Sequence, residues 1–219
     1  MSPVHASRSA VPEELTRSAS DFQGKLSFNR LLYTRREAEA AIAGLPRQEV
    51  FEALDFEASR VTAVSGKLTR YRTVHFATHG LVNNEHPDLS GLVLSLVDRH
   101  GEAQNGFLQL RDIYNLDLPV DTVVLSACNT ALGKETDGEG VIGITRGFMY
   151  AGASRVVSTL WSVSDSATAD LMRFFYSAMH QQGLGPPAAL RFAQIQMSKS
   201  GTWHSPRYWA GFEIQGDWQ

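Results

Sequence analysis

The sequence has little cysteine, no excess of basic residues and no long hydrophobic run. Its single cysteine, Cys128, cannot form a disulfide within the chain, which favours a reducing, cytoplasmic compartment. Lysine and arginine number 20 against 23 acidic residues, so no positive field favours nucleic-acid binding. No apolar run reaches the roughly 18 residues of a membrane-spanning helix, and no apolar core near residue 1 indicates export. We therefore expect a cytoplasmic globular protein that binds neither membrane nor nucleic acid.

Strand-like apolar runs alternate with helical segments along most of the chain. The strongest runs cover residues 73–77, 122–127 and 155–160, and weaker ones cover 26–33, 50–53, 91–96 and 209–214. Helical patterns cover 35–43, 56–68, 110–115, 141–150, 166–180 and 187–198. Strands that are apolar on both faces are typical of a mainly parallel sheet with helices on both faces. This pattern predicts a three-layer α/β domain over residues 26–219, preceded by a flexible linker or arm over residues 1–25.

Two reactive side chains follow the strongest predicted strands. His79 comes after the run 73–77, and Cys128 comes at the end of the run 122–127. Sites in parallel sheets form beyond the carboxyl ends of the strands, so neighbouring strands would bring both side chains to one edge. A thiol beside an imidazole has a lowered pKa and becomes a nucleophile. The alternative interpretation is a small buried thiol and a histidine that bonds only locally.

Three other patterns match known motifs only in part. His75 and His79 are four residues apart, which on a strand separates them by about 13 Å, so we expect no metal site and a satisfied core role for His75. Glycines 138, 140 and 143 match G-x-G-x-x-G, but about ten residues separate them from the preceding strand, unlike a dinucleotide-binding loop. Gly133-Lys134 precedes Glu135, where a P-loop has Ser or Thr. We therefore expect neither a metal nor an organic cofactor.

Several longer stretches resemble the CHAT domain, a caspase-like peptidase module often attached to tetratricopeptide repeats. The matching stretches, in order, are residues 71–80, 87–95, 124–133, 138–153, 160–165, 188–194 and 208–212. The resemblance spans about residues 32–218 and implies a caspase-like fold with a mainly parallel central sheet.

The resemblance implies peptide-bond hydrolysis by a Cys–His dyad, with His79 and Cys128 at the family's catalytic positions. Cys128 would attack the scissile carbonyl, and His79 would protonate the leaving amine. The backbone N–H groups of Gly80 and Cys128 would hold the oxyanion. The alternative is a non-catalytic module that keeps the fold and binds a peptide or protein in the cleft. The presence of both dyad residues favours the enzyme.

The resemblance also indicates where a substrate would bind. In related peptidases, the residues after the fourth sheet strand line the pocket for the residue before the cut, and here these include Trp161, Ser162 and Asp165. Separases, which cut after arginine, have an acidic residue where this chain has Ser162, and Asp88 is a further carboxylate available for binding. Asp165 also suits the cap of the following helix.

Three partners follow from this interpretation. The first is a polypeptide substrate, and the second is a regulatory repeat domain or protein of the kind that accompanies CHAT modules. The third is a second copy of the chain, because a sheet-edge strand near residues 209–214 would be able to pair with its own kind.

Overall fold

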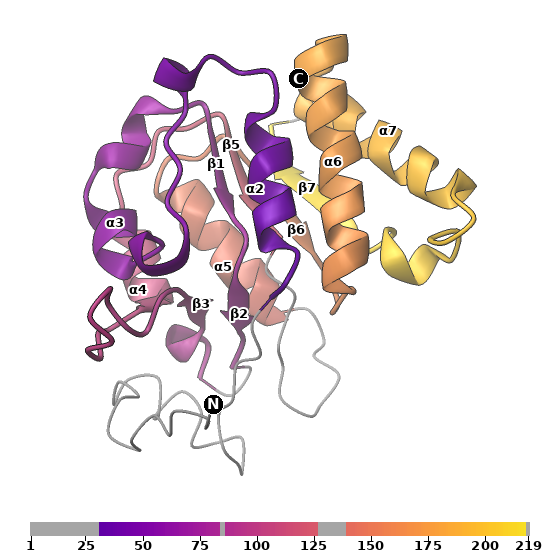
Figure 1. The fold of residues 1–219 in the computed structure, drawn as a ribbon. Coiled ribbons are helices and arrows are strands. Elements are labelled where there is room, and N and C mark those ends of the chain that lie inside the picture. The colour runs from indigo at the N-terminus through magenta and orange to yellow at the C-terminus, as the bar shows by residue number, and fades with distance from the viewer. Residues whose placement is uncertain (1–30, 84–85, 127–138, 218–219) are drawn as a thin grey trace, which may run out of the picture.

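The computed structural model describes residues 31–83, 86–126 and 139–217. Within these ranges the chain forms one larger sheet, one smaller sheet and the helices that cover them (Figure 1). The larger sheet contains β1 (Thr73–Phe76), β5 (Thr122–Leu125), β6 (Arg155–Thr159) and β7 (Phe212–Gly216). The smaller sheet contains β2 (His79–Leu81), β3 (Gly91–Val93) and β4 (Phe107–Gln109).

The larger sheet is parallel except at one edge. Its strand order is β1-β5-β6-β7, with β1, β5 and β6 parallel and β7 antiparallel to β6. All residues of β5 and β6 are buried, which explains why successive valines, 123 and 124 in β5 and 156 and 157 in β6, occur without apolar–polar alternation. In the pairing of β1 with β5, Phe76 lies opposite Leu125, so both strands end at the same level.

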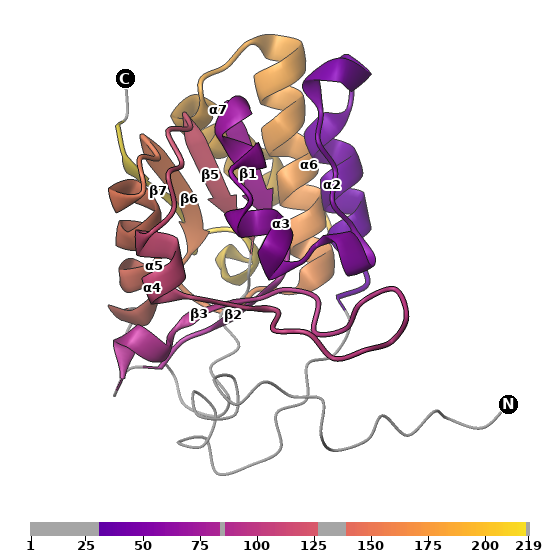
Figure 2. The same cartoon turned by 90° about the vertical axis from the view of Figure 1, so that its left-hand side faces the viewer.

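Helices cover both faces of this sheet, and Figure 2 shows the three layers from the side. One face carries α2 (Thr34–Ile42), α6 (Asp165–Gln182) and α7 (Pro186–Lys199). The other carries α3 (Arg60–Val64), α4 (Leu110–Tyr114) and α5 (Glu139–Tyr150). Alternate strand residues point to opposite faces and so supply two cores. Val123 and Val156 pack in the core beneath α3, α4 and α5. Val124 and Val157 pack in the core beneath α6 and α7.

The smaller antiparallel sheet lies beyond the carboxyl end of β1, because β2 begins only three residues after β1 ends. Its strands pack through Leu81, Val93 and Phe107. A Cβ atom at Gly91 would lie 2.2 Å from the carbonyl oxygen of Leu108, so only glycine allows β3 to approach β4 this closely.

The remaining segments are short helical turns and caps. The 3-10 turns are η1 (Arg47–Glu49), η2 (Asp55–Glu57), η3 (Lys67–Arg70), η4 (Pro87–Leu89) and η5 (Pro206–Tyr208). At the start of α4, Gln109 and Asp112 form a capping box, in which each side chain accepts a hydrogen bond from the other residue's backbone N–H. Gly183 adopts φ of 67° and ends α6 in the left-handed conformation.

The structure confirms the predicted α/β class, the mainly parallel sheet and its three strongest strands. The strand predicted at 50–53 is wrong, because these residues pair with no described strand. The helix predicted at 56–68 is broken into η2, α3 and η3, and Gly66 enters η3 with φ of 73°. Residues 31–33 are not in a strand; the rest of the strand predicted at 26–33, and the arm at 1–25, lie outside the described residues.

Candidate active site at the carboxyl end of the sheet

His79 is held by the junction between the two sheets. It is the third residue after the end of β1 and the first residue of β2, opposite Val93 of β3. The hydroxyl of the preceding residue, Thr78, donates a hydrogen bond to the Val93 carbonyl oxygen. Pairing with β3 fixes the backbone of His79. The residue as a whole is half-buried, and its Nδ1 atom is shielded from solvent.

Gly80, the predicted oxyanion donor, follows directly in β2. It is buried and lies opposite Leu92 of β3. A hydrogen bond joins the two ends of the connection from β2 to β3: the Asn83 backbone N–H donates to the Ser90 hydroxyl oxygen at 3.0 Å. Asp88 lies in η4 within this connection and is exposed, so its carboxylate is presented to solvent on the same hairpin that carries His79.

Cys128 lies outside the described residues, but the strand that leads to it is well defined. β5 ends at Leu125, directly beside the end of β1 at Phe76. Cys128 is therefore the third residue after the end of β5, as His79 is the third residue after the end of β1. The two predicted dyad residues thus follow adjacent parallel strands that stop at the same level.

Trp161 follows the next strand, β6, and is anchored on two sides. Its indole N–H donates a hydrogen bond of 2.9 Å to the carbonyl oxygen of Arg207, and its ring lies against Gly211. The side chain remains 39% exposed. Ser162, the next residue, is also exposed. Both predicted substrate-binding residues are therefore accessible at the same edge of the sheet as the ends of β1 and β5.

Asp165 has a structural contact in addition to its predicted role. It is the first residue of α6, after the N-cap position at Ser164, and its Oδ2 accepts a hydrogen bond of 2.9 Å from the Tyr33 backbone N–H. Asp165 thus fastens the start of α2 to the start of α6. The structure brings His79, Gly80 and Asp88 onto one hairpin. It places Trp161 and Ser162 on the connection from β6 to α6, and Asp165 at the start of α6.

A buried polar cluster beside β1 was only partly foreseen from the sequence. His75 is satisfied in the core, as predicted: its Nε2 lies 2.9 Å from Ser126 Oγ and its Nδ1 lies 3.1 Å from the Tyr176 hydroxyl oxygen. Sequence reasoning missed its partners, Glu37 in α2, Tyr176 in α6 and Ser126 after β5. The signal was a glutamate among the alanines of α2 on the side that packs against α6.

The electrostatics of this cluster are set by burial. Glu37 is 1% exposed and Tyr176 is 1% exposed. Burial, and secondarily the negative charge of Glu37, raise the pKa of the Tyr176 hydroxyl well above its ordinary value. Tyr176 therefore stays protonated at neutral pH and keeps a hydroxyl hydrogen to donate.

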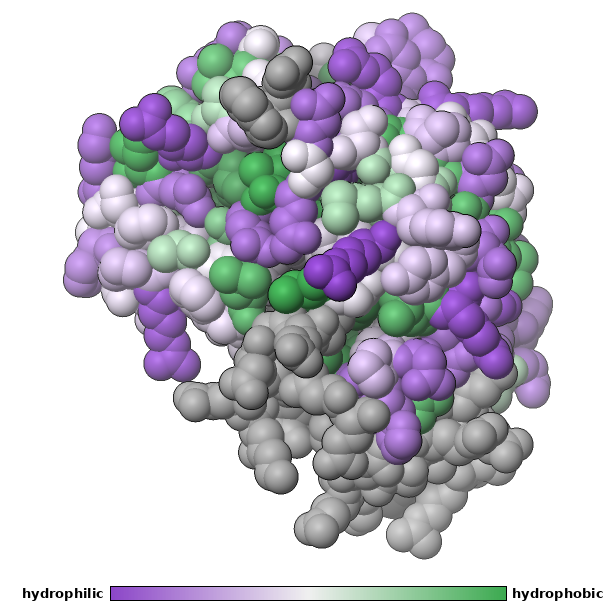
Figure 3. Space-filling view, turned by 180° about the vertical axis from the view of Figure 1, so that it is seen from behind, coloured by the Kyte–Doolittle hydropathy of each residue, from purple (hydrophilic) through white to green (hydrophobic). Residues whose placement is uncertain are grey.

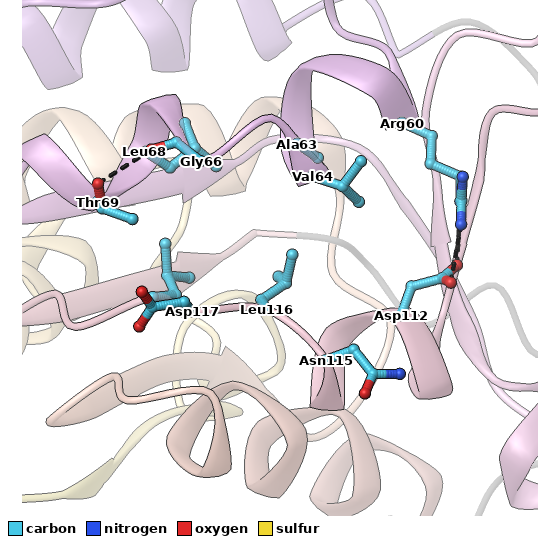
Figure 4. Close-up of a pocket in the computed structure, with 11 residues that line it drawn as sticks. Arg60, Ala63, Val64, Gly66, Leu68, Thr69, Asp112, Asn115, Leu116 and Asp117 are labelled. Atoms are coloured by element: carbon cyan, nitrogen blue, oxygen red, sulfur yellow. Dashed lines mark hydrogen bonds and ion pairs between the residues drawn. The ribbon is translucent and has the colours of Figure 1, made fainter.

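A pocket of about 430 Å³ lies away from this site, between α3 with η3 on one side and the connection from α4 to β5 on the other (Figure 4). Its charged wall is an ion pair in which Arg60 contacts both carboxylate oxygens of Asp112, at 3.0 and 2.8 Å. Leu68 and Leu116 line it on facing sides. Because η3 and residues 115–118 lead into the amino ends of β1 and β5, the pocket is separate from His79.

The described residues were also compared with the requirements of a metal site and of a membrane-spanning helix. No three histidine, cysteine, aspartate or glutamate side chains there come together as a metal site requires. Among the same residues, no helix is both long and apolar enough to cross a membrane.

Comparison with known proteins identifies the family. A model of the CHAT domain matches residues 2–217. Tetratricopeptide repeat protein 28 of Homo sapiens is 37% identical over 113 residues, covering 52% of this chain and 4% of that protein; its Mus musculus counterpart is 36% identical over 109 residues, covering 50% and 4%. The chain thus spans a small part of the length of these relatives. With a parallel sheet flanked by helices and a match over nearly its whole length, this chain belongs to the CHAT domain family and has its caspase-like fold.

Proposed function

We propose that this CHAT domain is a cysteine endopeptidase that hydrolyses peptide bonds with His79 and Cys128. The observation that carries the proposal is the in-register parallel pairing of β1 with β5. Each strand is followed, three residues after its end, by one member of the dyad. Adjacent strands that end together are the geometry in which a thiol and an imidazole from distant parts of the sequence meet.

The proposed reaction has two steps. Cys128 transfers its thiol proton to His79 and attacks the scissile carbonyl carbon through Sγ, while backbone N–H groups of Gly80 and Cys128 stabilise the oxyanion. His79 then donates the proton to the leaving amine, so that the C–N bond breaks and an acyl-enzyme remains. Water, deprotonated by His79, attacks the acyl carbon and the C–S bond breaks, which releases the carboxyl product. His79 returns the proton to Sγ of Cys128, so that the thiol and the neutral imidazole are restored.

Substrate binding is proposed to involve the exposed residues around this edge. Trp161 and Ser162 are accessible after β6, and an indole ring of this kind forms a flat wall for an apolar or planar side chain. Asp88 offers an exposed carboxylate on the hairpin of His79. Asp165 uses Oδ2 on Tyr33, so its Oδ1 is the oxygen proposed to face a substrate.

Two partners belong to the proposal. Because the relatives are named as tetratricopeptide repeat proteins, a repeat domain or protein is proposed to regulate the enzyme. The coloured part of the face in Figure 3 shows hydrophobic residues in separate groups among hydrophilic ones, without a single broad apolar surface.

The second proposed partner is another copy of this chain. The outer strand β7 pairs with β6 and with no other described strand, so β7 is the proposed site of pairing between the two copies.

The alternative is a non-catalytic module that binds a peptide at the same edge. One experiment distinguishes the two hypotheses. A peptide library is incubated with the wild-type protein or with Cys128→Ala, and the products are sequenced. The enzyme proposal predicts cleavage at defined sites by the wild type and none by Cys128→Ala. An exposed-histidine variant, His100→Ala, should cleave like the wild type. Cleavage by Cys128→Ala at the wild-type rate would contradict the proposal.

A further inference from the structure

Trp161 is held at the edge of the larger sheet by three contacts. Its indole N–H donates a hydrogen bond of 2.9 Å to the Arg207 carbonyl oxygen. Its own carbonyl oxygen accepts a hydrogen bond of 2.9 Å from the hydroxyl of Thr159, the last residue of β6. Its ring lies so close to Gly211 that a Cβ atom there would be 2.6 Å from Cε2. The backbone and the ring are therefore both fixed, although 39% of the residue is exposed.

The turn before β7 carries two of these contacts and is itself held by Gln194 of α7. The side-chain Nε2 of Gln194 donates to the carbonyl oxygens of Phe212, at 2.8 Å, and of Trp209, at 3.3 Å. Because both partners are carbonyl oxygens, the amide must present its NH₂ group, which has one hydrogen for each. Gly211 lies between these two residues in the sequence. One side chain thus brackets the point at which the turn meets the ring of Trp161.

The same turn is joined to β6 by its backbone. The Leu160 N–H donates a hydrogen bond of 2.9 Å to the Gly211 carbonyl oxygen, and Thr159 lies opposite Phe212 in the antiparallel pairing of β6 with β7. The turn is therefore held by β6 on one side and by Gln194 of α7 on the other. Loss of the Gln194 amide would release it on one side, and the indole ring that rests against Gly211 would move with it.

These contacts also determine what the exposed part of Trp161 offers to a ligand. The indole N–H is the only hydrogen-bond donor of the ring, and it is used on the Arg207 carbonyl oxygen. The exposed surface of the ring therefore consists of carbon atoms and their π electrons, which contact flat or apolar side chains. A wall of this kind discriminates between substrates by how closely a side chain packs against it, so its position sets the preference.

We propose that Gln194 and Thr159 are positioning residues that fix Trp161 in place, and that they thereby set a preference for a large apolar or aromatic side chain before the cut. The inference rests on the proposed endopeptidase function, in which Trp161 lines the pocket for that side chain. Thr159 acts on the backbone of Trp161, and Gln194 acts through the turn that supports its ring. The proposal gives a role to Gln194, which takes no part in the dyad chemistry.

The test compares variants of nearly equal size that each delete hydrogen bonds. Gln194→Met removes the amide, and Gln196→Met is its matched control, because Gln196 also lies in α7 and its side chain bonds to none of the described residues. Thr159→Val removes the hydroxyl that holds the Trp161 carbonyl oxygen. Its control is Thr122→Val, because Thr122 is fully buried in β5 and its hydroxyl likewise has no bonding partner within the described ranges.

The values of kcat and KM are measured for three peptides that are built on a sequence cleaved by the wild type and differ only in having leucine, phenylalanine or alanine before the cut. We expect Gln194→Met and Thr159→Val each to raise KM for the leucine and phenylalanine peptides on the order of 10-fold, with kcat changed by about twofold or less. KM for the alanine peptide should change much less, because a methyl group reaches little of the ring. Gln196→Met and Thr122→Val should match the wild type, and circular dichroism verifies that each variant is folded.

An unchanged KM for the leucine and phenylalanine peptides in folded Gln194→Met would overturn the role of Gln194, even if the variant melts at a lower temperature. The same result in Thr159→Val would overturn the role of Thr159, and an equal rise for all three peptides would overturn the effect on preference. The two variants delete different contacts, so either one tests the placement of Trp161 if the other does not fold. Cleavage by Cys128→Ala, or no cleavage by the wild type, would instead overturn the endopeptidase function, so the two failures are distinguishable.

Discussion

The contact between Trp161 and Gly211 gives the most quantitative prediction. In the Gly211→Ala variant, the added Cβ would lie 2.6, 2.8 and 3.0 Å from Cε2, Cδ2 and Cζ2 of the Trp161 indole. Carbon atoms in good contact are about 3.5–4.0 Å apart, so the ring must move by about 1 Å. That movement would strain or break the 2.9 Å hydrogen bond from the indole N–H to the Arg207 carbonyl oxygen.

The cost follows from these two effects. Forcing an extra methyl group into a packed site costs about 1–3 kcal/mol, and loss of one hydrogen bond costs about 1 kcal/mol. Trp161 is 39% exposed, so its ring is able to relieve the overlap by moving outward. The total cost should therefore lie at the lower end of the combined range of about 2–4 kcal/mol. We therefore expect Gly211→Ala to lower the free energy of unfolding by about 2 kcal/mol.

Urea denaturation followed by circular dichroism measures this difference. Gly201→Ala is the matched control, because a Cβ there has no atom within 4 Å. If Trp161 also lines the substrate pocket, Gly211→Ala should raise KM for cleaved peptides while Gly201→Ala leaves it unchanged. Equal stability of the two variants would refute the packing argument, and equal KM would refute the role of Trp161 in binding.

The remaining predictions concern the small sheet, the buried tyrosine and a helix cap. Gly91→Ala places a Cβ 2.2 Å from a backbone oxygen of β4 and should destabilise the fold by at least about 3 kcal/mol; a wild-type melting temperature would contradict this. Burial and Glu37 raise the pKa of Tyr176, so above about pH 10 the unfolded chain loses this proton first and stability should fall by up to about 1.4 kcal/mol per pH unit. Alkaline titrations of unfolding should show a shallower fall in Tyr176→Phe, and an identical slope would refute the assignment. Asp112→Ala removes the α4 capping box and the Arg60 ion pair, so urea denaturation should show a loss of about 1–2 kcal/mol; an unchanged midpoint would count against both contacts.

The sequence was sufficient to predict the main strands and the large helices, because long apolar runs and helical periods report directly on burial. The segments 73–77, 122–127 and 155–160 match β1, β5 and β6 to within two residues at each end. The three-residue strands β2 and β4 were not predicted, because three residues are too few to show a period. They exist through pairing with β3, which is a tertiary property.

At the candidate site, the sequence predicted the strand ends that precede His79 and Cys128. His79 and the strand ends of β1 and β5 follow from local pattern, and the structure adds that His79 itself begins a strand. The contacts of Glu37 with His75, and of Asp165 with Tyr33, join residues far apart in the sequence. No local pattern encodes such pairs, since they depend on how α2 packs against α6.

The most direct measurement of the central claim is the pH dependence of Cys128 alkylation in the wild type and in His79→Ala. If the two residues form a dyad, the wild-type thiol should react well below pH 8. Removal of His79 should then move the midpoint toward that of an ordinary cysteine, about 8.5, and should abolish peptide cleavage. The His100→Ala control should keep the wild-type profile. An identical alkylation profile in His79→Ala and the wild type would contradict the dyad.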